Sequence, residues 1–170
     1  MNPMKKIRIR KLTVNVGTGK DQKELDRGLL LIKHITGLEG VKTITNKRIP
    51  GWGLRPGLAV GCKLTLRKDK AVELAKKFLE TKENLLEENN FDGHGNISFG
   101  ITEYIEIPGI EYNHDIGMMG FQVCITLERP GYRLTKRRRF KKSLPRNHVV
   151  DKQEAMQFMK DEFNIKVGEL

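Results

Sequence analysis

The feature that most constrains this chain is a long loop between two strand-like segments. Segments 43–45 and 58–67 both have strand character, and the loop at 46–57 between them contains five glycines and prolines. This density of glycine and proline suits a shaped excursion better than a tight two-residue turn. A loop of this length without secondary structure of its own is usually either functional or disordered. The stretch therefore predicts a β-hairpin with a protruding loop.

The hairpin loop also carries three cations and the only tryptophan of the chain. A cation-rich loop with one aromatic residue, held between two strands, favours contact with a nucleic acid. With five glycines and prolines the loop has few residues that can pack, so we expect it to be mobile. The candidate contact residues are Lys47, Arg48, Trp52 and Arg55.

Charge and cysteine usage narrow the class of protein. The 170 residues include 32 Lys and Arg against 21 Asp and Glu, which gives a net charge of +11. A pI near 9.7 with clustered cations is typical of nucleic-acid-binding proteins. Residues 1–10 do not resemble a signal peptide, and no apolar run reaches the length of a membrane span. Cys62 and Cys124 lie in apolar strand patterns, which favours buried reduced thiols and leaves a disulfide as the alternative.

Periodicity predicts an α+β fold in which helices pack on one face of a mostly antiparallel sheet. Near Arg10 and Lys11 the apolar residues change parity, which indicates a bulge or a late start of the first strand. Asp151 and Glu154 have the spacing of a capping box. No repeat or linker is apparent, so we expect 1–170 to form a single domain. The expected elements are strands over 6–16, 41–45, 58–67, 97–107, 121–127 and 165–167 and helices over 21–36, 69–86 and 151–163.

Polar side chains share the outward face of three of these strands. Segment 58–67 alternates between apolar residues and small, polar or cationic ones, as expected for a half-exposed sheet. Hydroxyls, an amide and cations on one face suit RNA, whose 2′-hydroxyl both donates and accepts hydrogen bonds. An ordinary solvated face is the alternative interpretation. The residues on this predicted face are Lys11, Thr13, Asn15, Thr43, Thr45, Lys63, Thr65 and Arg67.

The densest charge lies at 129–147, a predicted basic arm that no acidic residue interrupts. Such a run repels itself and is usually a tail or arm that orders on an anion. We expect its arginines and lysines to contact RNA phosphates, with an anionic membrane surface or a targeting signal as alternatives. Tyr132, Phe140 and two prolines lie among the cations, which are Arg129, Arg133, Lys136, Arg137, Arg138, Arg139, Lys141, Lys142 and Arg146.

Patterns for catalysis or cofactor binding are weak. The turn 17–20 follows a strand and precedes a helix, but it lacks the length and the hydroxyl of a Walker loop. The histidines and cysteines do not have zinc-ligand spacing, and neither Ser98 nor Ser143 lies in a nucleophile elbow. We expect no enzymatic activity, no metal and no cofactor. A nucleotide-dependent enzyme that uses Gly17 to Lys20 is the alternative.

Several separate motifs resemble one known family. Segments 11–17, 35–37 with Thr43, 49–57 with 61–67, and 91–100 (Phe-Asp-Gly-His-Gly-Asn-Ile-Ser-Phe-Gly) are similar to the universal large-subunit ribosomal protein number five, a family that binds 5S rRNA. The resemblance covers nearly the whole chain. The chain lacks the extra N-terminal helix of the bacterial form. Arg129 to Arg133, the basic run and His148 are similar to the archaeal and eukaryotic form, and the short length favours an archaeal protein.

The resemblance implies a place in the central protuberance of the large ribosomal subunit, in the cytoplasm. The implied partners are 5S rRNA, large-subunit rRNA, peptidyl-site tRNA, neighbouring 5S-associated proteins and a protein of the small-subunit head, and no membrane. Asn15 and Thr65 match family positions on the 5S rRNA face, and Trp52 and Arg55 match the tRNA-facing loop. Leu38 and Gly40 replace a glutamine and a proline that are usual in the family, so Leu38 is not a candidate. The other proposed 5S rRNA contacts extend the matched ones and are Lys11, Thr13, Thr43 and Lys63.

Overall fold

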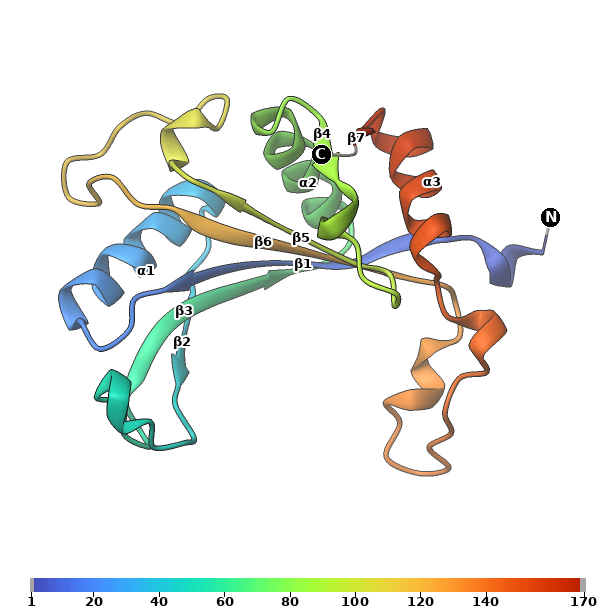
Figure 1. Cartoon of the computed structure of the whole chain (residues 1–170), viewed down its shortest axis with the longest axis horizontal. Helices are drawn as coiled ribbons and strands as arrows, with labels where there is room; N and C mark the ends of the chain where they lie inside the picture. Colours follow the sequence, from blue (N-terminus) through green and yellow to red (C-terminus); the bar gives the residue numbers. More distant parts are fainter. Residues whose placement is uncertain (1, 169–170) are drawn as a thin grey trace. The chain divides into compact units, whose positions relative to one another are not determined.

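The computed structural model describes residues 2–168 and has an α+β fold (Figure 1). Three α-helices are combined with a mostly antiparallel five-stranded sheet, as the sequence predicts, and with a small two-stranded sheet that it did not predict. The elements are β1 (Arg8–Gly17), α1 (Gln22–Thr36), β2 (Val41–Ile44), β3 (Ala59–Leu66), α2 (Asp69–Thr81), β4 (Leu85–Glu87), β5 (Asn96–Ile101), β6 (Phe121–Glu128), α3 (Lys152–Phe163) and β7 (Lys166–Gly168).

The strand order of the larger sheet is β2-β3-β1-β6-β5, so β2 and β5 form its edges. β2 and β3 are the two strands of the predicted hairpin and pair antiparallel, with Val41 opposite Lys63 and Thr43 opposite Gly61. The small sheet pairs β4 with β7 in parallel. The chain groups into two compact units, which are residues 13–66 with 100–123, and residues 1–12 with 67–99 and 124–170. That the whole chain is one domain stays a prediction.

In the first of these units, α1 covers one face of the strands (Figure 1). A methyl group added at Gly28 of this helix would lie 3.0 Å from Cys62 Sγ and 3.2 Å from Val16 Cγ1. A side chain there would require these two neighbours to shift by a few tenths of an ångström, so glycine favours the close approach of the helix to the sheet. Asp21 Oδ1 accepts a hydrogen bond from Lys23 N at the start of α1, and Gly37 ends it in the left-handed conformation. Both helix boundaries agree with the sequence.

The second unit contains α2, α3 and the small sheet. Asp151 and Glu154 form the predicted capping box, in which Asp151 N donates to Glu154 Oε2 at 3.2 Å. Before β5, the Asp92 carboxylate accepts hydrogen bonds from His94 N and from the backbone and side-chain nitrogens of Asn96, at 2.6–2.8 Å. Burial opposes ionisation of this carboxyl group, but these hydrogen bonds outweigh it, and the pKa of Asp92 is lowered from 3.8.

The first half of β1 is where the sequence predicts a change of face, near Arg10. Arg8 and Arg10 both reach the Glu128 carboxylate, at 3.0 and 3.4 Å, and Glu128 has the outward parity of β6. Leu12, two residues after Arg10, is fully buried. A regular strand would place Arg10 and Leu12 on the same face, and the bulge predicted between them stays a prediction. The strand starts at Arg8, two residues later than expected.

Two expected elements are shorter than predicted. The helix predicted over 69–86 ends at Thr81, because Glu83 and Asn84 adopt left-handed conformations with φ of 54° and 55°. The strand predicted over 97–107 ends at Ile101, and a 3₁₀ turn follows at Tyr104–Glu106. That turn places the Tyr104 side chain in the core, fully buried. Both cysteines are free, as expected for reduced thiols. Cys62 is buried as expected, but the expectation that Cys124 is buried was wrong, because it is half-buried.

Candidate nucleic-acid interface

The face of the sheet opposite α1 carries mostly polar side chains, beside the exposed Val41, in the unit of residues 13–66 and 100–123. The hydroxyl oxygens of Thr13 and Thr65 lie 3.5 Å apart, so these two side chains share a face. Opposite strand partners also share a face, which adds Thr43 through its pairing with Gly61 and places Lys63 two positions further along β3. Asn15 continues the face along β1. We call the following residues the open sheet face: Thr13, Asn15, Thr43, Lys63, Thr65 and Gln122.

Gln122 is a member of this face that was not among the expected contacts. Asn15 Nδ2 donates a hydrogen bond to Gln122 Oε1 at 3.4 Å, which connects β1 with β6. The signal was present in the sequence, because Phe121 and Val123 are buried and Gln122 lies between them with outward parity. The open sheet face therefore contains two amides and several hydroxyls but only one cation.

Gly61 lies where β3 closely approaches β1 and β2. A methyl group added at Gly61 would lie only 2.5 Å from the Val16 carbonyl oxygen and 3.2 Å from Thr43 Oγ1. Contacts under 3.0 Å with backbone atoms require the strands to move. Lys11, the remaining expected contact, precedes Thr13 in β1 with the same parity, is half-buried, and belongs to the other compact unit.

The hairpin loop has more internal structure than expected. Ile49 and Leu54 exchange two backbone hydrogen bonds of 3.1 Å, and residues Pro50–Trp52 between them form a 3₁₀ turn. Leu54 is buried, so it anchors the loop. The assumption that the loop has no secondary structure of its own was wrong. Its mobility stays a prediction.

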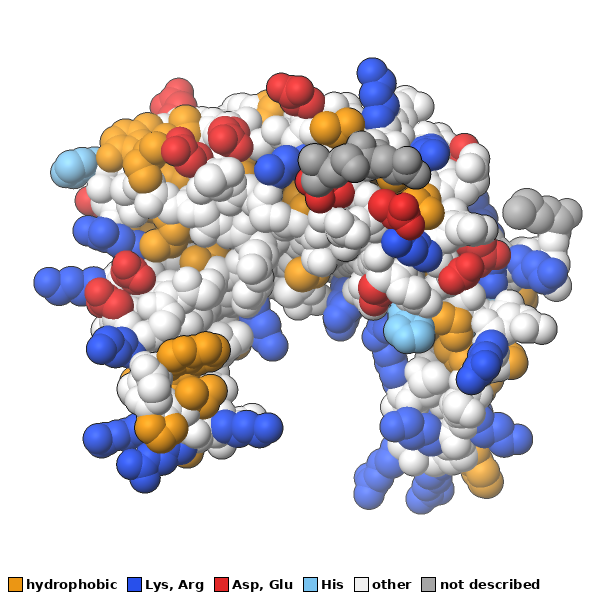
Figure 2. All heavy atoms as spheres, in the orientation of Figure 1, with side chains coloured by type: hydrophobic (Ala, Val, Ile, Leu, Met, Phe, Trp, Pro, Cys, Tyr) orange, Lys and Arg blue, Asp and Glu red, His pale blue; other side chains and the backbone are white. Residues whose placement is uncertain are grey.

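The four candidate contact residues of the loop all point into solvent. Trp52, at the turn, is 71% exposed, and Lys47, Arg48 and Arg55 are also exposed. Blue side chains surround this hairpin loop, drawn in teal in Figure 1, in the space-filling view of Figure 2. The loop therefore displays one flat aromatic ring among cations, which suits stacking on a base next to phosphates.

The basic arm, drawn in orange in Figure 1, has a defined backbone. Tyr132–Thr135 and Arg146–His148 form 3₁₀ turns, and Lys142 N donates to Leu134 O at 3.2 Å. The arm is therefore not an extended tail. Figure 2 shows a dense group of blue side chains over it. Arg137 is half-buried, and the other predicted phosphate contacts are exposed: Arg133, Lys136, Arg138, Arg139, Lys141, Lys142 and Arg146.

Arg129 does not belong with these exposed cations. It is only 7% exposed, and its guanidinium donates to Glu154 Oε1 at 2.6 Å and to the Asn147 carbonyl oxygen at 3.2 Å. The expectation that Arg129 contributes to the RNA-binding charge is therefore wrong. Nearby, His148 Nε2 lies 2.7 Å from the Pro130 carbonyl oxygen. These contacts join the two ends of the basic arm and hold its base closed.

An acidic loop at residues 102–120 contrasts with the basic regions. It contains four acidic residues and no lysine or arginine. The loop is held in place from inside, because the buried Tyr104 hydroxyl accepts a hydrogen bond from Asn113 N at 2.9 Å, and Ile116 is buried. Tyr112 and Met118 are exposed on its outside. Such a surface repels phosphates and favours a basic protein.

The turn at 17–20 does not have the geometry of a nucleotide site. Thr18 N and Gly19 N both donate to the Val60 carbonyl oxygen at 3.1 Å, so neither is free to bind a phosphate. The N-terminus of α1, which follows, is already capped by the Asp21 carboxylate. A phosphate cradle needs backbone N–H groups that point at the ligand. The nucleotide-dependent alternative therefore loses its structural basis.

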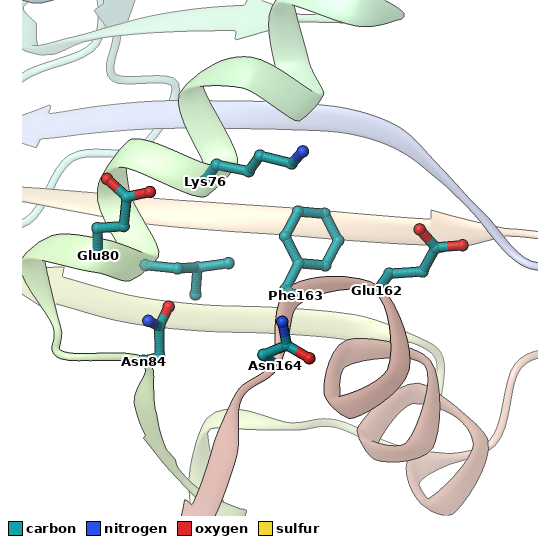
Figure 3. Close-up of a pocket in the computed structure, with 7 residues that line it drawn as sticks. Lys76, Glu80, Asn84, Glu162, Phe163 and Asn164 are labelled. Carbon is teal, nitrogen blue, oxygen red and sulfur yellow. The ribbon is translucent and has the colours of Figure 1, made fainter.

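A pocket of about 280 Å³ lies between the C-terminal ends of α2 and α3 (Figure 3). Its polar lining mixes the charges of Lys76, Glu80 and Glu162, and the ring of Phe163 points from the end of α3 toward α2.

Over residues 2–168, no group of three or more His, Cys, Asp or Glu side chains is placed to hold a metal ion. In the same residues no helix has the length and apolar character that a membrane crossing requires.

Comparisons with known proteins give one consistent result. Residues 2–55 match the family described as "Ribosomal protein L5", and residues 59–166 match the model that describes the C-terminus of the same ribosomal family. The "Large ribosomal subunit protein uL5" of Sulfolobus acidocaldarius is 44% identical over 168 residues, which cover 99% of this chain and 94% of the relative. The proteins of the same name from Sulfurisphaera tokodaii and Methanobrevibacter smithii are 42% and 41% identical, over 99% and 97% of this chain and 96% and 97% of their own lengths. These archaeal relatives and the two matches, which together span nearly the whole chain, confirm the resemblance seen in the motifs, and the chain belongs to the ribosomal protein L5 family.

Proposed function

We propose that this chain is a structural constituent of the large ribosomal subunit that binds 5S rRNA in the central protuberance. We further propose that its hairpin loop contacts peptidyl-site tRNA and that it helps to bridge to the small-subunit head. Membership of the ribosomal protein L5 family carries the assignment to the large subunit, in the cytoplasm, as a structural protein rather than an enzyme. The finer assignments rest on the surfaces described above.

The open sheet face supports the assignment to 5S rRNA. Its side chains both donate and accept hydrogen bonds, and its centre at Gly61 has no side chain that would prevent a close approach. RNA differs from DNA by a 2′-hydroxyl that also donates and accepts, and a hydroxyl-rich face is suited to read it. Only Lys63 is charged among the residues of this face. Contacts made here therefore depend on geometry more than on salt concentration.

The basic arm supports a second, less selective contact with rRNA. Its exposed arginines and lysines are suited to phosphates, which position a protein on RNA but carry no sequence information directly. The closed base of the arm, held by Arg129 and His148, presents these cations on a defined loop. We therefore assign affinity and salt dependence to the basic arm, and selectivity to the open sheet face.

The hairpin loop and the acidic loop support the remaining two contacts. Trp52 and Arg55, exposed on the hairpin loop, give a stacking surface beside a cation, as a tRNA contact requires. The acidic loop at 102–120 is unsuited to RNA because four negative charges would meet phosphates. We assign it to the bridge, where a protein partner with a basic surface would complement it.

The experiment that tests the assignment to 5S rRNA compares the full chain on two RNAs. Affinity is measured for 5S rRNA and for an unrelated folded RNA of similar length over a series of salt concentrations. A preference for 5S rRNA that persists as salt rises is the expected result, because hydrogen bonds of the open sheet face are weakly screened. Equal affinities that fall together with salt would show only phosphate binding and would contradict the assignment.

A further inference from the structure

Phe140 is the most exposed large hydrophobic side chain of the described residues, at 82%. It lies in the basic arm between Arg138 and Arg139 on one side and Lys141 and Lys142 on the other. A single exposed apolar residue on a protein surface is ordinary. The backbone around Phe140 is what distinguishes it.

Phe140 has a left-handed backbone conformation, with φ of 53°. This conformation is unfavourable for a residue with a bulky side chain, and it persists only where the surrounding structure imposes it. Two hydrogen bonds impose it here. Arg137 Nε donates to the Phe140 carbonyl oxygen at 2.7 Å, and Lys142 N donates to the Leu134 carbonyl oxygen at 3.2 Å. The arm therefore uses one of its own arginines to hold a phenylalanine ring out in solvent.

We infer that Phe140 is a stacking site for an unpaired RNA base, with the flanking cations on the neighbouring phosphates. This inference rests on the proposed contact between the basic arm and rRNA, and it adds the kind of RNA that the arm recognises. An aromatic ring in a cationic groove binds single-stranded nucleic acid because every base has a face that can stack on it. Bases in a continuous helix are not available, so the site selects a loop, a bulge or a strand end.

The charge around Phe140 favours an RNA base over an apolar protein pocket as the partner of its ring. Four cations are within two residues of Phe140, and no acidic residue interrupts the segment 129–147. An apolar protein pocket would have to be surrounded by several carboxylates to accept this ring, whereas RNA supplies a stacking face and phosphates together. Anionic lipid offers the same charge and an apolar interior, so the experiment includes vesicles.

The test uses the full chain and two RNA duplexes that differ only in a three-nucleotide bulge. Phe140→Leu removes the aromatic face and keeps an apolar side chain, and Phe140→Trp keeps a stacking face. We expect Phe140→Leu to weaken binding to the bulged RNA by roughly tenfold, while binding to the continuous duplex changes less than about twofold. The slope of log affinity against log salt should not change, because no charge is lost. Phe140→Trp should bind the bulged RNA at least as tightly as the original chain.

Arg138→Gln is the matched control, because Arg138 is an exposed neighbour that bears a charge. It should weaken binding to both RNAs. The slope of log affinity against log salt should fall by about 1, the value for one lost phosphate contact. If Arg138→Gln behaves so but Phe140→Leu affects both RNAs equally or neither, the stacking site is wrong and the arm still binds RNA. If neither variant changes the affinity for either RNA, the arm itself is not an RNA contact. Binding to phosphatidylserine vesicles that depends on Phe140 and resists RNA competition would overturn the inference in favour of a membrane.

Discussion

Replacement of Arg129 by Met should destabilise the fold without removing an RNA contact. Arg129 is buried, and its guanidinium donates to the Glu154 carboxylate at 2.6 Å and to the Asn147 carbonyl oxygen at 3.2 Å. Methionine preserves much of the apolar stem but makes neither hydrogen bond. The Asn147 carbonyl oxygen would lose this donor, and Glu154 would keep only the hydrogen bond from Asp151 N.

The size of the effect follows from these contacts. A hydrogen bond to a charged group contributes about 1.5–3 kcal/mol, and the Arg129 guanidinium is charged in both contacts. The Glu154 side chain is 44% exposed, so water replaces part of its lost interaction and the lower end of the range applies to that hydrogen bond. We therefore expect a loss of about 3–4.5 kcal/mol. For a chain of this length, that corresponds to a decrease of roughly 5–15 °C in Tm.

Thermal and guanidinium unfolding followed by circular dichroism measure this loss, with Arg133→Met as the matched control. Arg133 is an exposed cation of the same arm, so its replacement should leave Tm within about 2 °C. A double-mutant cycle of Arg129→Met with Glu154→Gln should give a coupling energy of about 1–2 kcal/mol. An unchanged Tm together with a lower salt slope for RNA binding would refute this reasoning. It would place Arg129 with the exposed cations, as expected from the sequence.

Three further predictions concern stability and thiol chemistry. Gly61→Ala should lower the free energy of unfolding by about 1–3 kcal/mol in guanidinium titrations, because its methyl group would lie 2.5 Å from the Val16 carbonyl oxygen. Asp92 has a lowered pKa, so its ionisation stabilises the fold above pH 3.8, and this contribution is lost as the pH falls through the lowered value. The stability advantage over Asp92→Asn should therefore shrink in acid, and a constant difference would contradict it. Burial raises the pKa of Cys62 to about 11, so at about pH 8 its thiol should react with Ellman's reagent only after unfolding.

The sequence predicted helix ends well where nearby capping residues determine them. Asp21 and Gly37 bound α1, and Asp151 with Glu154 starts α3, because capping is decided within a few residues. The end of α2 was not predictable in this way. It depends on left-handed Glu83 and Asn84, which lack the glycine signal, and on the pairing of β4 with the distant β7.

In the candidate interface, too, features set by local sequence were predicted and features that depend on distant residues were not. Alternation along the strands identified most of the open sheet face, and it also contained the information for Gln122. Charge alone marked the exposed cations of the basic arm. Charge did not separate Arg129 from its neighbours, because its partner Glu154 lies 25 residues away and its burial depends on tertiary structure. The internal hydrogen bonds of the hairpin loop also depend on backbone geometry that its glycines and prolines do not specify.

The central claim is that the open sheet face selects 5S rRNA and that the basic arm supplies salt-dependent affinity. The most direct test measures the salt dependence of binding to 5S rRNA and to an unrelated folded RNA for two double variants. Asn15→Ala with Thr65→Val should reduce the preference for 5S rRNA and leave the salt slope unchanged. Arg139→Gln with Lys141→Gln should keep the preference and reduce the slope by about 1.5, the value for two phosphate contacts. If both variants weaken binding to both RNAs by the same factor, the division between selectivity and affinity is wrong.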